Sequence, residues 1–295
     1  MGTSNAFGGA SGGTPLIPSW LDGDGSDSGA SSTPADGQPD SDNDDVASPA
    51  VPPAPQERPA IPAAGASDRF TAARGNFTRF AGSGGRDRRS LGRAVSQYVS
   101  KSAGGSRQAA RRMGASRGAA TGLVGFLNNA STNGVREALR SLNLESLAGR
   151  PIEEVFVGLA DYVCPDGGSI DEGIARDAFV ETIADLAEAG ITDIDGLTSD
   201  QIQTVFELYA THAIEARICN DIGTKLITMP SDPRTAEQVE GQLRDFIQRG
   251  VSDALNSADV NIRSLASEAV MGFVTDVYQS AFEILQTMGE GEAAK

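Results

Sequence analysis

The first 66 residues of the chain contain too few large apolar side chains to form a folded domain alone. Gly, Ser, Pro and Asp dominate this stretch, and its large apolar residues are Phe7, Leu16, Ile17, Trp20, Leu21, Val46, Val51 and Ile61. Burying so few side chains does not offset about 1–2 kcal/mol of backbone entropy per ordered residue. The sequence therefore predicts a disordered acidic tail over residues 1–66, and about 230 residues remain to build a core.

Beyond this tail, apolar residues recur at the spacing of α-helices. Phe70, Phe77 and Phe80 fall near one helical face, and no stretch alternates with period two over a useful length. We expect Asp171 to cap one helix, and Thr198 with Gln201 to form a capping box for another. The pattern predicts an all-α fold with a helical, bundle-like body. Its clearest helices are expected near residues 86–102, 106–128, 151–163, 234–255 and 260–288.

The charge is distributed in three blocks. Residues 1–66 contain nine acidic residues and one basic residue, residues 67–122 contain two and twelve, and residues 123–295 contain twenty-nine and eleven. We therefore expect a basic helical segment over 67–130, an acidic α-helical domain over 131–289 and a disordered C-terminus over 290–295. The overall formal charge of −16 conceals this acidic–basic–acidic order.

The residues that carry most enzyme chemistry are scarce. The only histidine is His212, and the only cysteines, Cys164 and Cys219, lack the spacing of a metal or redox motif. No phosphate-binding G-x-x-x-x-G-K-[ST] motif is present. These observations favour a protein that is not an enzyme, with no metal and with buried structural thiols. No signal peptide or apolar membrane span is evident, so we expect a cytoplasmic protein that does not interact with membranes.

Two features of the tail invite a functional interpretation. Removal of Met1 would expose the amine of Gly2, an event common to many proteins that begin in this way. An apolar island in the otherwise polar tail contains the only tryptophan. Such an island is either a chance apolar patch or a docking motif that fills a groove on a partner. Its candidate partner-binding residues are Leu16, Ile17, Trp20 and Leu21.

The basic block has two interpretations. Interleaved arginines and aromatic residues are typical of nucleic-acid binding. Arginine is also favoured at protein interfaces, where it pairs with acidic surfaces, and we favour this second interpretation. A purely structural scaffold is the third alternative for the chain as a whole. The candidate interface residues are Arg69, Arg74, Arg79, Arg107, Arg111 and Arg112.

Five short runs of sequence resemble the QatB family of the Qat anti-phage defence system. They are Met1-Gly2-Thr3-Ser4, Pro18-Ser19-Trp20-Leu21-Asp22, Arg69 to Phe80, Ala110 to Gly114, and Pro165-Asp166-Gly167-Gly168-Ser169. The resemblance implies a defence role beside an ATPase (QatA), a QueC-like enzyme (QatC) and a TatD-like nuclease (QatD). None of the five runs is a catalytic signature.

The same resemblance implies that the chain is itself a substrate. Defence-associated QueC relatives join a deazaguanine to the N-terminal glycine of a protein, which places the acceptor amine on Gly2. Thr3, Ser4 and Asn5 would then enter the channel of the enzyme, where small side chains obstruct least. No cofactor is implied except this covalent deazaguanine. An α-amine has a pKa of about 8, so part of it is neutral and nucleophilic at cellular pH.

Overall fold

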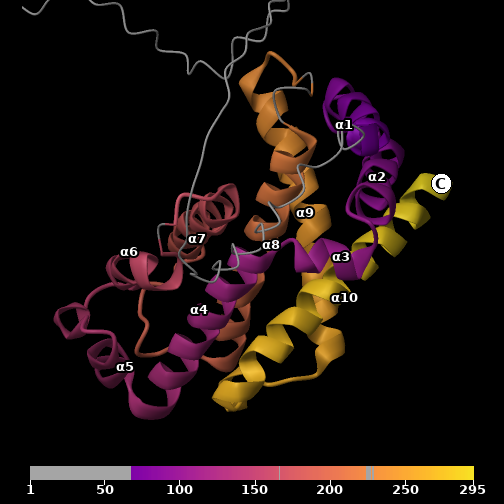
Figure 1. The fold of residues 1–295 in the computed structure, drawn as a ribbon. Helices are drawn as coiled ribbons and strands as arrows, with labels where there is room; N and C mark the ends of the chain where they lie inside the picture. Colours follow the sequence, from indigo (N-terminus) through magenta and orange to yellow (C-terminus); the bar gives the residue numbers. More distant parts are fainter. Residues whose placement is uncertain (1–67, 166, 224–226, 228) are drawn as a thin grey trace, which may run out of the picture. The chain divides into compact units, whose positions relative to one another are not determined.

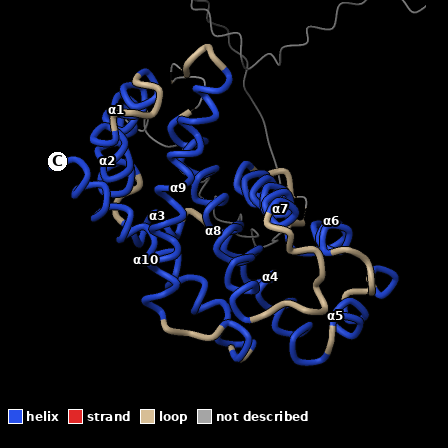
Figure 2. The backbone as a smooth tube through the Cα atoms, turned by 180° about the vertical axis from the view of Figure 1, so that it is seen from behind, coloured by secondary structure: helices blue, strands red, loops and turns tan. Residues whose placement is uncertain are grey.

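The computed structural model describes residues 68–165, 167–223, 227 and 229–295, and these residues belong to one compact unit. The described residues form helices and loops with no β-strand, so the predicted all-α class is confirmed (Figures 1 and 2). No helix in these ranges is long and apolar enough to cross a membrane. The α-helices are α1 (Thr71–Gly82), α2 (Arg88–Gln97), α3 (Ser106–Arg111), α4 (Gly114–Asn133), α5 (Val135–Ser141), α6 (Ile152–Val163), α7 (Ile170–Glu188), α8 (Ser199–Ile222), α9 (Pro233–Ala258) and α10 (Ser267–Ala294).

The described helices share a single hydrophobic core, in contrast to the expected division at residue 130. Buried side chains form one continuous cluster that runs from Phe70 in the basic segment to Leu285 in the acidic one. The helix α4 also crosses the expected boundary without a break. The segments 67–130 and 131–289 differ in charge, but the charge pattern does not mark two separately folded domains, because α2 and α3 bury their apolar faces against α10.

Two helix starts test the capping predictions. Thr198 and Gln201 form the predicted capping box at the start of α8, so this prediction is confirmed. Asp171 does not cap α7, in contrast to our expectation. The N-cap of α7 is Ser169, two residues before Asp171. Ser169 forms a capping box with Glu172. Asp171 lies in the first turn and pairs instead with Arg217 of α8.

The predicted helix at 106–128 is two helices. The break falls at Arg112 and Met113, between α3 and α4, and α4 continues to Asn133. The predicted helix at 86–102 is α-helical only up to Gln97, where α2 ends. A π-helical turn, η2, covers Tyr98–Ser102. This turn lies between α2 and α3, and both helices contact α10.

The C-terminal helix is longer than predicted. We expected residues 290–295 to be disordered, but α10 runs to Ala294. A close contact explains the extra turn: Gly92 of α2 and Gly289 of α10 face each other without side chains between them. A Cβ atom built on Gly92 would lie 2.6 Å from the carbonyl oxygen of Gly289 and 2.7 Å from the Cβ of Glu292. The end of α10 is therefore held by its packing against α2.

The Gly92–Gly289 contact predicts a destabilising effect for a single methyl group. Gly92→Ala would force the backbones of α2 and α10 apart, and such overpacking typically costs about 1–3 kcal/mol. The free energy of unfolding, measured by urea denaturation, should fall by this amount.

A matched substitution separates this contact from helix propensity. Gly272 also lies in α10, and a Cβ atom there would meet nothing within 4 Å. Gly272→Ala should leave the free energy of unfolding unchanged or raise it by up to about 1 kcal/mol. An equal response of the two variants would contradict the proposed close approach.

Candidate functional site

The residues predicted to be modified or to bind a partner in the tail lie outside the described residues. This applies to Gly2, Thr3, Ser4 and Asn5 at the tip and to the island of Leu16, Ile17, Trp20 and Leu21. Their roles stay predictions. The candidate residues that the structure does describe belong to the basic helices.

The six candidate interface arginines divide into two groups. Arg74 donates from Nε to the carbonyl oxygen of Ile222 at 2.7 Å, and Arg112 pairs with the carboxylate of Asp221 at 3.2 Å. These two side chains connect the basic helices to the end of α8. The remaining four, Arg69, Arg79, Arg107 and Arg111, are exposed. The structure therefore holds two of the six arginines in contacts with α8 and leaves the other four exposed.

Asp221 is the centre of a buried polar cluster that the sequence did not reveal. Its side chain is 7% exposed, and it accepts a hydrogen bond of 2.9 Å from the Tyr98 hydroxyl. Arg112 approaches from the end of α3, and Arg217 lies one turn before Asp221 on α8 with its Nε at 3.4 Å. Arg217 also pairs with Asp171 of α7. Burial and the Asp221 carboxylate raise the pKa of Tyr98, so its hydroxyl stays protonated and donates.

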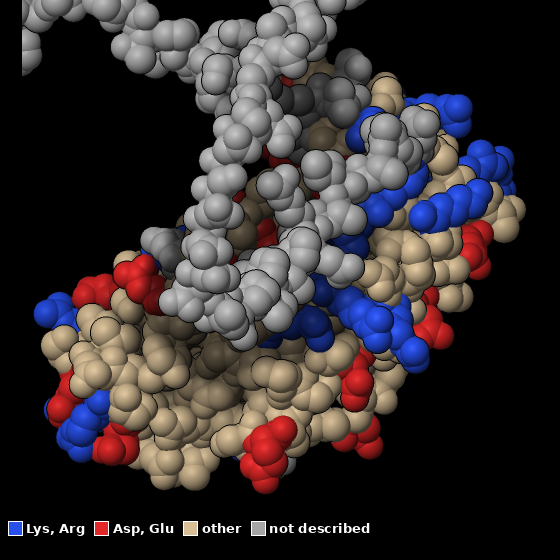
Figure 3. Space-filling model, in the orientation of Figure 1, with Lys and Arg blue, Asp and Glu red and all other residues tan. Residues whose placement is uncertain are grey.

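A second set of basic side chains has no carboxylate partner comparable to Asp221 among the described residues. Arg86, Arg89, Arg93, Lys101, Arg107 and Arg111 are exposed and form no ion pair with any residue that the structure describes. We call this set the basic face. In Figure 3, basic side chains gather on the upper right of the molecule, over the region where Figure 1 draws α1 to α3. Four of the six members were counted in the basic block but not singled out from the sequence.

The aromatic residues of the basic block do not belong to this surface. Phe70, Phe77, Phe80 and Tyr98 are between 1% and 8% exposed and form part of the core. Base stacking on aromatic side chains is a main source of affinity for single-stranded nucleic acid. The described part of the basic block therefore offers charge without stacking platforms, which weakens the nucleic-acid interpretation.

His212 is a buried structural residue. Its side chain is 3% exposed, and its Nε2 lies 2.7 Å from Oδ2 of Asp185 on α7. Glu215, one turn further on α8, accepts a hydrogen bond of 2.8 Å from Arg244 of α9. These contacts tie α8 to both neighbouring helices. No group of three or more metal-binding side chains lies close together among the described residues.

A polar cavity of about 440 Å³ lies between α2, α8 and α9. Two arginines, Arg88 and Arg249, and two carboxylates, Glu207 and Asp245, line it, so its charges balance. Glu207 also accepts a hydrogen bond from Gln248, another lining residue. This arrangement has no excess of either charge with which to select an ionic ligand.

Both cysteines are poor nucleophiles in the folded protein. Burial raises the pKa of the Cys164 thiol to about 12, and burial together with Glu215 and Glu240 does the same for Cys219. At pH 8 a thiol of this pKa is ionised in about 1 molecule in 10,000, against roughly one in four for an ordinary cysteine.

This shift predicts slow thiol labelling. At pH 8 the folded protein should release thionitrobenzoate from Ellman's reagent orders of magnitude more slowly than the same protein in urea, where both thiols regain ordinary pKa values. Absorbance at fixed reagent concentration measures both rates. Fast labelling of one thiol in the folded state would contradict its burial.

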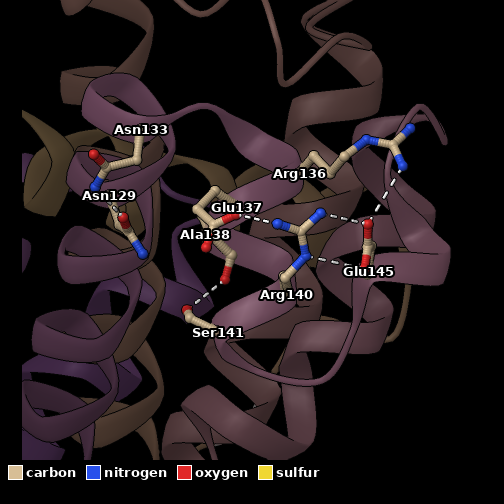
Figure 4. A network of polar contacts seen from close by, with 8 residues as sticks. All are labelled: Asn129, Asn133, Arg136, Glu137, Ala138, Arg140, Ser141 and Glu145. Carbon is tan, nitrogen blue, oxygen red and sulfur yellow. Dashed lines mark hydrogen bonds and ion pairs between the residues drawn. The ribbon is translucent and has the colours of Figure 1, made fainter.

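The Asp221 cluster predicts a large effect on stability. Asp221→Asn leaves Arg112 and Arg217 without their shared carboxylate in a buried site, and breaking a buried pair in this way typically costs about 3–5 kcal/mol. Urea denaturation measures the loss. Figure 4 shows a suitable control, in which the exposed Arg140 lies between Glu137 and Glu145. Glu145→Gln should leave stability nearly unchanged, because exposed ion pairs are screened by water.

Comparison with known proteins places the chain in a family. The model of the family described as Qat anti-phage system associated protein QatB matches residues 104–285. This match covers more than half of the chain, from the start of α3 into the last third of α10. No curated protein and no solved structure is significantly similar to the chain. The helical body built around Asp221 and α10 is thus that of a member of the QatB family.

Proposed function

We propose that this chain serves the Qat system as an adaptor and as a protein substrate, with a deazaguanine joined to the amine of Gly2 by a QueC-like partner, QatC. Membership of the QatB family makes it an accessory protein of an anti-phage defence system. Its partners are proposed to lie within that system, with the ATPase QatA and the TatD-like nuclease QatD beside QatC, and its location is proposed to be cytoplasmic.

The sequence of the tip carries the proposal. Once Met1 is removed, the chain begins with Gly2, followed by Thr3, Ser4 and Asn5, whose side chains are all small. A reactive amine must reach the bottom of a closed active site, and a thin, extended chain without bulky side chains obstructs this approach least.

The chemistry of the described residues supports a substrate rather than a catalyst. The reactivity of both thiols is suppressed by burial, and the single histidine is engaged by Asp185 inside the core. The nucleophile in the proposed reaction is therefore a main-chain amine, and the activating groups belong to the partner enzyme.

The proposed step forms one amide bond. The partner enzyme transfers AMP from ATP to the carboxylate of a carboxy-deazaguanine and releases pyrophosphate. The neutral Gly2 amine attacks the activated carbonyl carbon, AMP leaves, and the amine loses one proton. The chain gains the mass of the carboxy-deazaguanine less one water.

Intact-mass spectrometry tests the proposed modification. The chain purified after co-expression with its genomic neighbours should show the mass of the product, and digestion should place the added mass on the N-terminal peptide. The variant Gly2→Val should carry no adduct and give no phage protection, since a β-branched side chain next to the amine hinders its attack.

The matched control changes another glycine of the tail. Gly12→Val makes the same substitution ten residues further on and should be modified and protective like the parent chain. An unmodified N-terminus in protective cells, or full protection by Gly2→Val, would refute the modification. A scaffold that needs only its helical body would in addition protect cells after deletion of residues 2–45.

A further inference from the structure

An apolar cavity of about 100 Å³ lies between α1, α8 and α9. Most of its wall consists of large apolar side chains that are no more than 7% exposed, namely Phe77, Phe80, Ile218, Ile222, Val239 and Leu243. Ile227 and Met229, in the connection from α8 to α9, add to the apolar lining. This cavity thus differs in character from the polar cavity beside α2.

Two lining side chains carry polar groups. Cys219 of α8 contributes a thiol, and Glu240 of α9 contributes a carboxylate. Burial, together with Glu215 and Glu240, raises the pKa of the Cys219 thiol to about 12, so the thiol stays neutral. Among the described residues that line the cavity, Glu240 alone therefore carries a charge. Glu240 is also the exposed member of the lining, so its carboxylate marks the place where the cavity meets solvent.

The neighbouring cations do not pair with this carboxylate. Arg244, one turn further on α9, pairs with Glu215 at 2.8 Å. Arg74 of α1 donates to the carbonyl oxygen of Ile222 at 2.7 Å, and neither arginine lines the cavity. Glu240 forms no ion pair with a residue that the structure describes. A negative charge without an ion-pair partner thus stands at the mouth of an apolar cavity.

The physical chemistry of such a cavity favours an apolar guest over water. A water molecule in an apolar cavity lacks the two to four polar partners that hold buried water, and engineered apolar cavities of about 150 Å³ stay dry and bind benzene. The wall atoms of an empty cavity also lack dispersion contacts, which a guest of the right size restores.

We propose that this cavity binds a small free amine with an apolar body, whose ring or short chain lies between Phe80 and Leu243 and whose ammonium group meets the carboxylate of Glu240. The ammonium stays in contact with water at the mouth, so binding does not bury its charge. A neutral molecule of the same shape gains the cavity contacts alone, and a carboxylate is repelled by Glu240. The proposal is independent of the modification of Gly2.

Thermal unfolding of the full chain with three ligands of one shape tests the proposal. Benzylamine is positive at neutral pH, benzyl alcohol is uncharged and benzoate is negative. At about 10 mM, an amine with a dissociation constant of about 3 mM should raise the midpoint of unfolding by about 2–4 °C. Benzyl alcohol should raise it by less, and benzoate should leave it unchanged.

Two conditions separate the cavity from general electrostatics. The ionic strength is kept equal for all ligands, because screening alters the repulsion within an acidic chain. Methylamine carries the same charge as benzylamine but has no ring to fill the cavity. It should therefore leave the midpoint unchanged.

A matched pair of variants locates the charge. Glu240→Gln keeps the cavity but removes its charge, so the shift caused by benzylamine should fall to that of benzyl alcohol. Glu237→Gln makes the same change on an exposed residue of α9 that does not line the cavity. This control should respond to benzylamine like the parent chain.

Filling the cavity should abolish binding. Ala81 lines the cavity, and Ala81→Leu places a side chain where the ring of the ligand would lie. The variant should show no shift with benzylamine or benzyl alcohol. Cys219→Met is a second filling variant, with a flexible side chain that adapts to an irregular space.

Four results would overturn the proposal. Benzylamine could shift the midpoint no more than methylamine does, or no more than benzoate does. The variants of Glu240 and Glu237 could respond alike to benzylamine. A folded filling variant could also keep the full shift of the parent chain.

Discussion

The buried carboxylate of Asp221 is the interaction on which the arrangement of the N-terminal helices depends. It accepts from Tyr98 of η2 and pairs with Arg112 at the end of α3 and with Arg217 of its own helix. A carboxylate at 7% exposure is stable only when its charge is matched and its lone pairs are used. One side chain thereby connects the basic segment to the acidic α8, and the break between α3 and α4 lets Arg112 reach it.

This connection divides the arginines of the basic block by role. Arg74 donates a hydrogen bond to the main chain at the end of α8, and Arg112 forms an ion pair with Asp221, so both side chains hold the fold together. The exposed arginines of α2 and α3 form no ion pair with a described residue. The helices of residues 67–122 therefore bury their apolar side chains in the core and expose basic side chains on their other faces.

The sequence was sufficient for the fold class and for features that depend on neighbouring residues, such as the capping box of Thr198 and Gln201. It was insufficient where tertiary contacts determine where a helix ends or which partner a side chain meets. The contact of Gly92 with Gly289 extends α10 past the expected end, and neither glycine is distinctive in its local sequence. The sequence could not separate Arg112 from Arg111 either, because the difference is the partner that each meets in space.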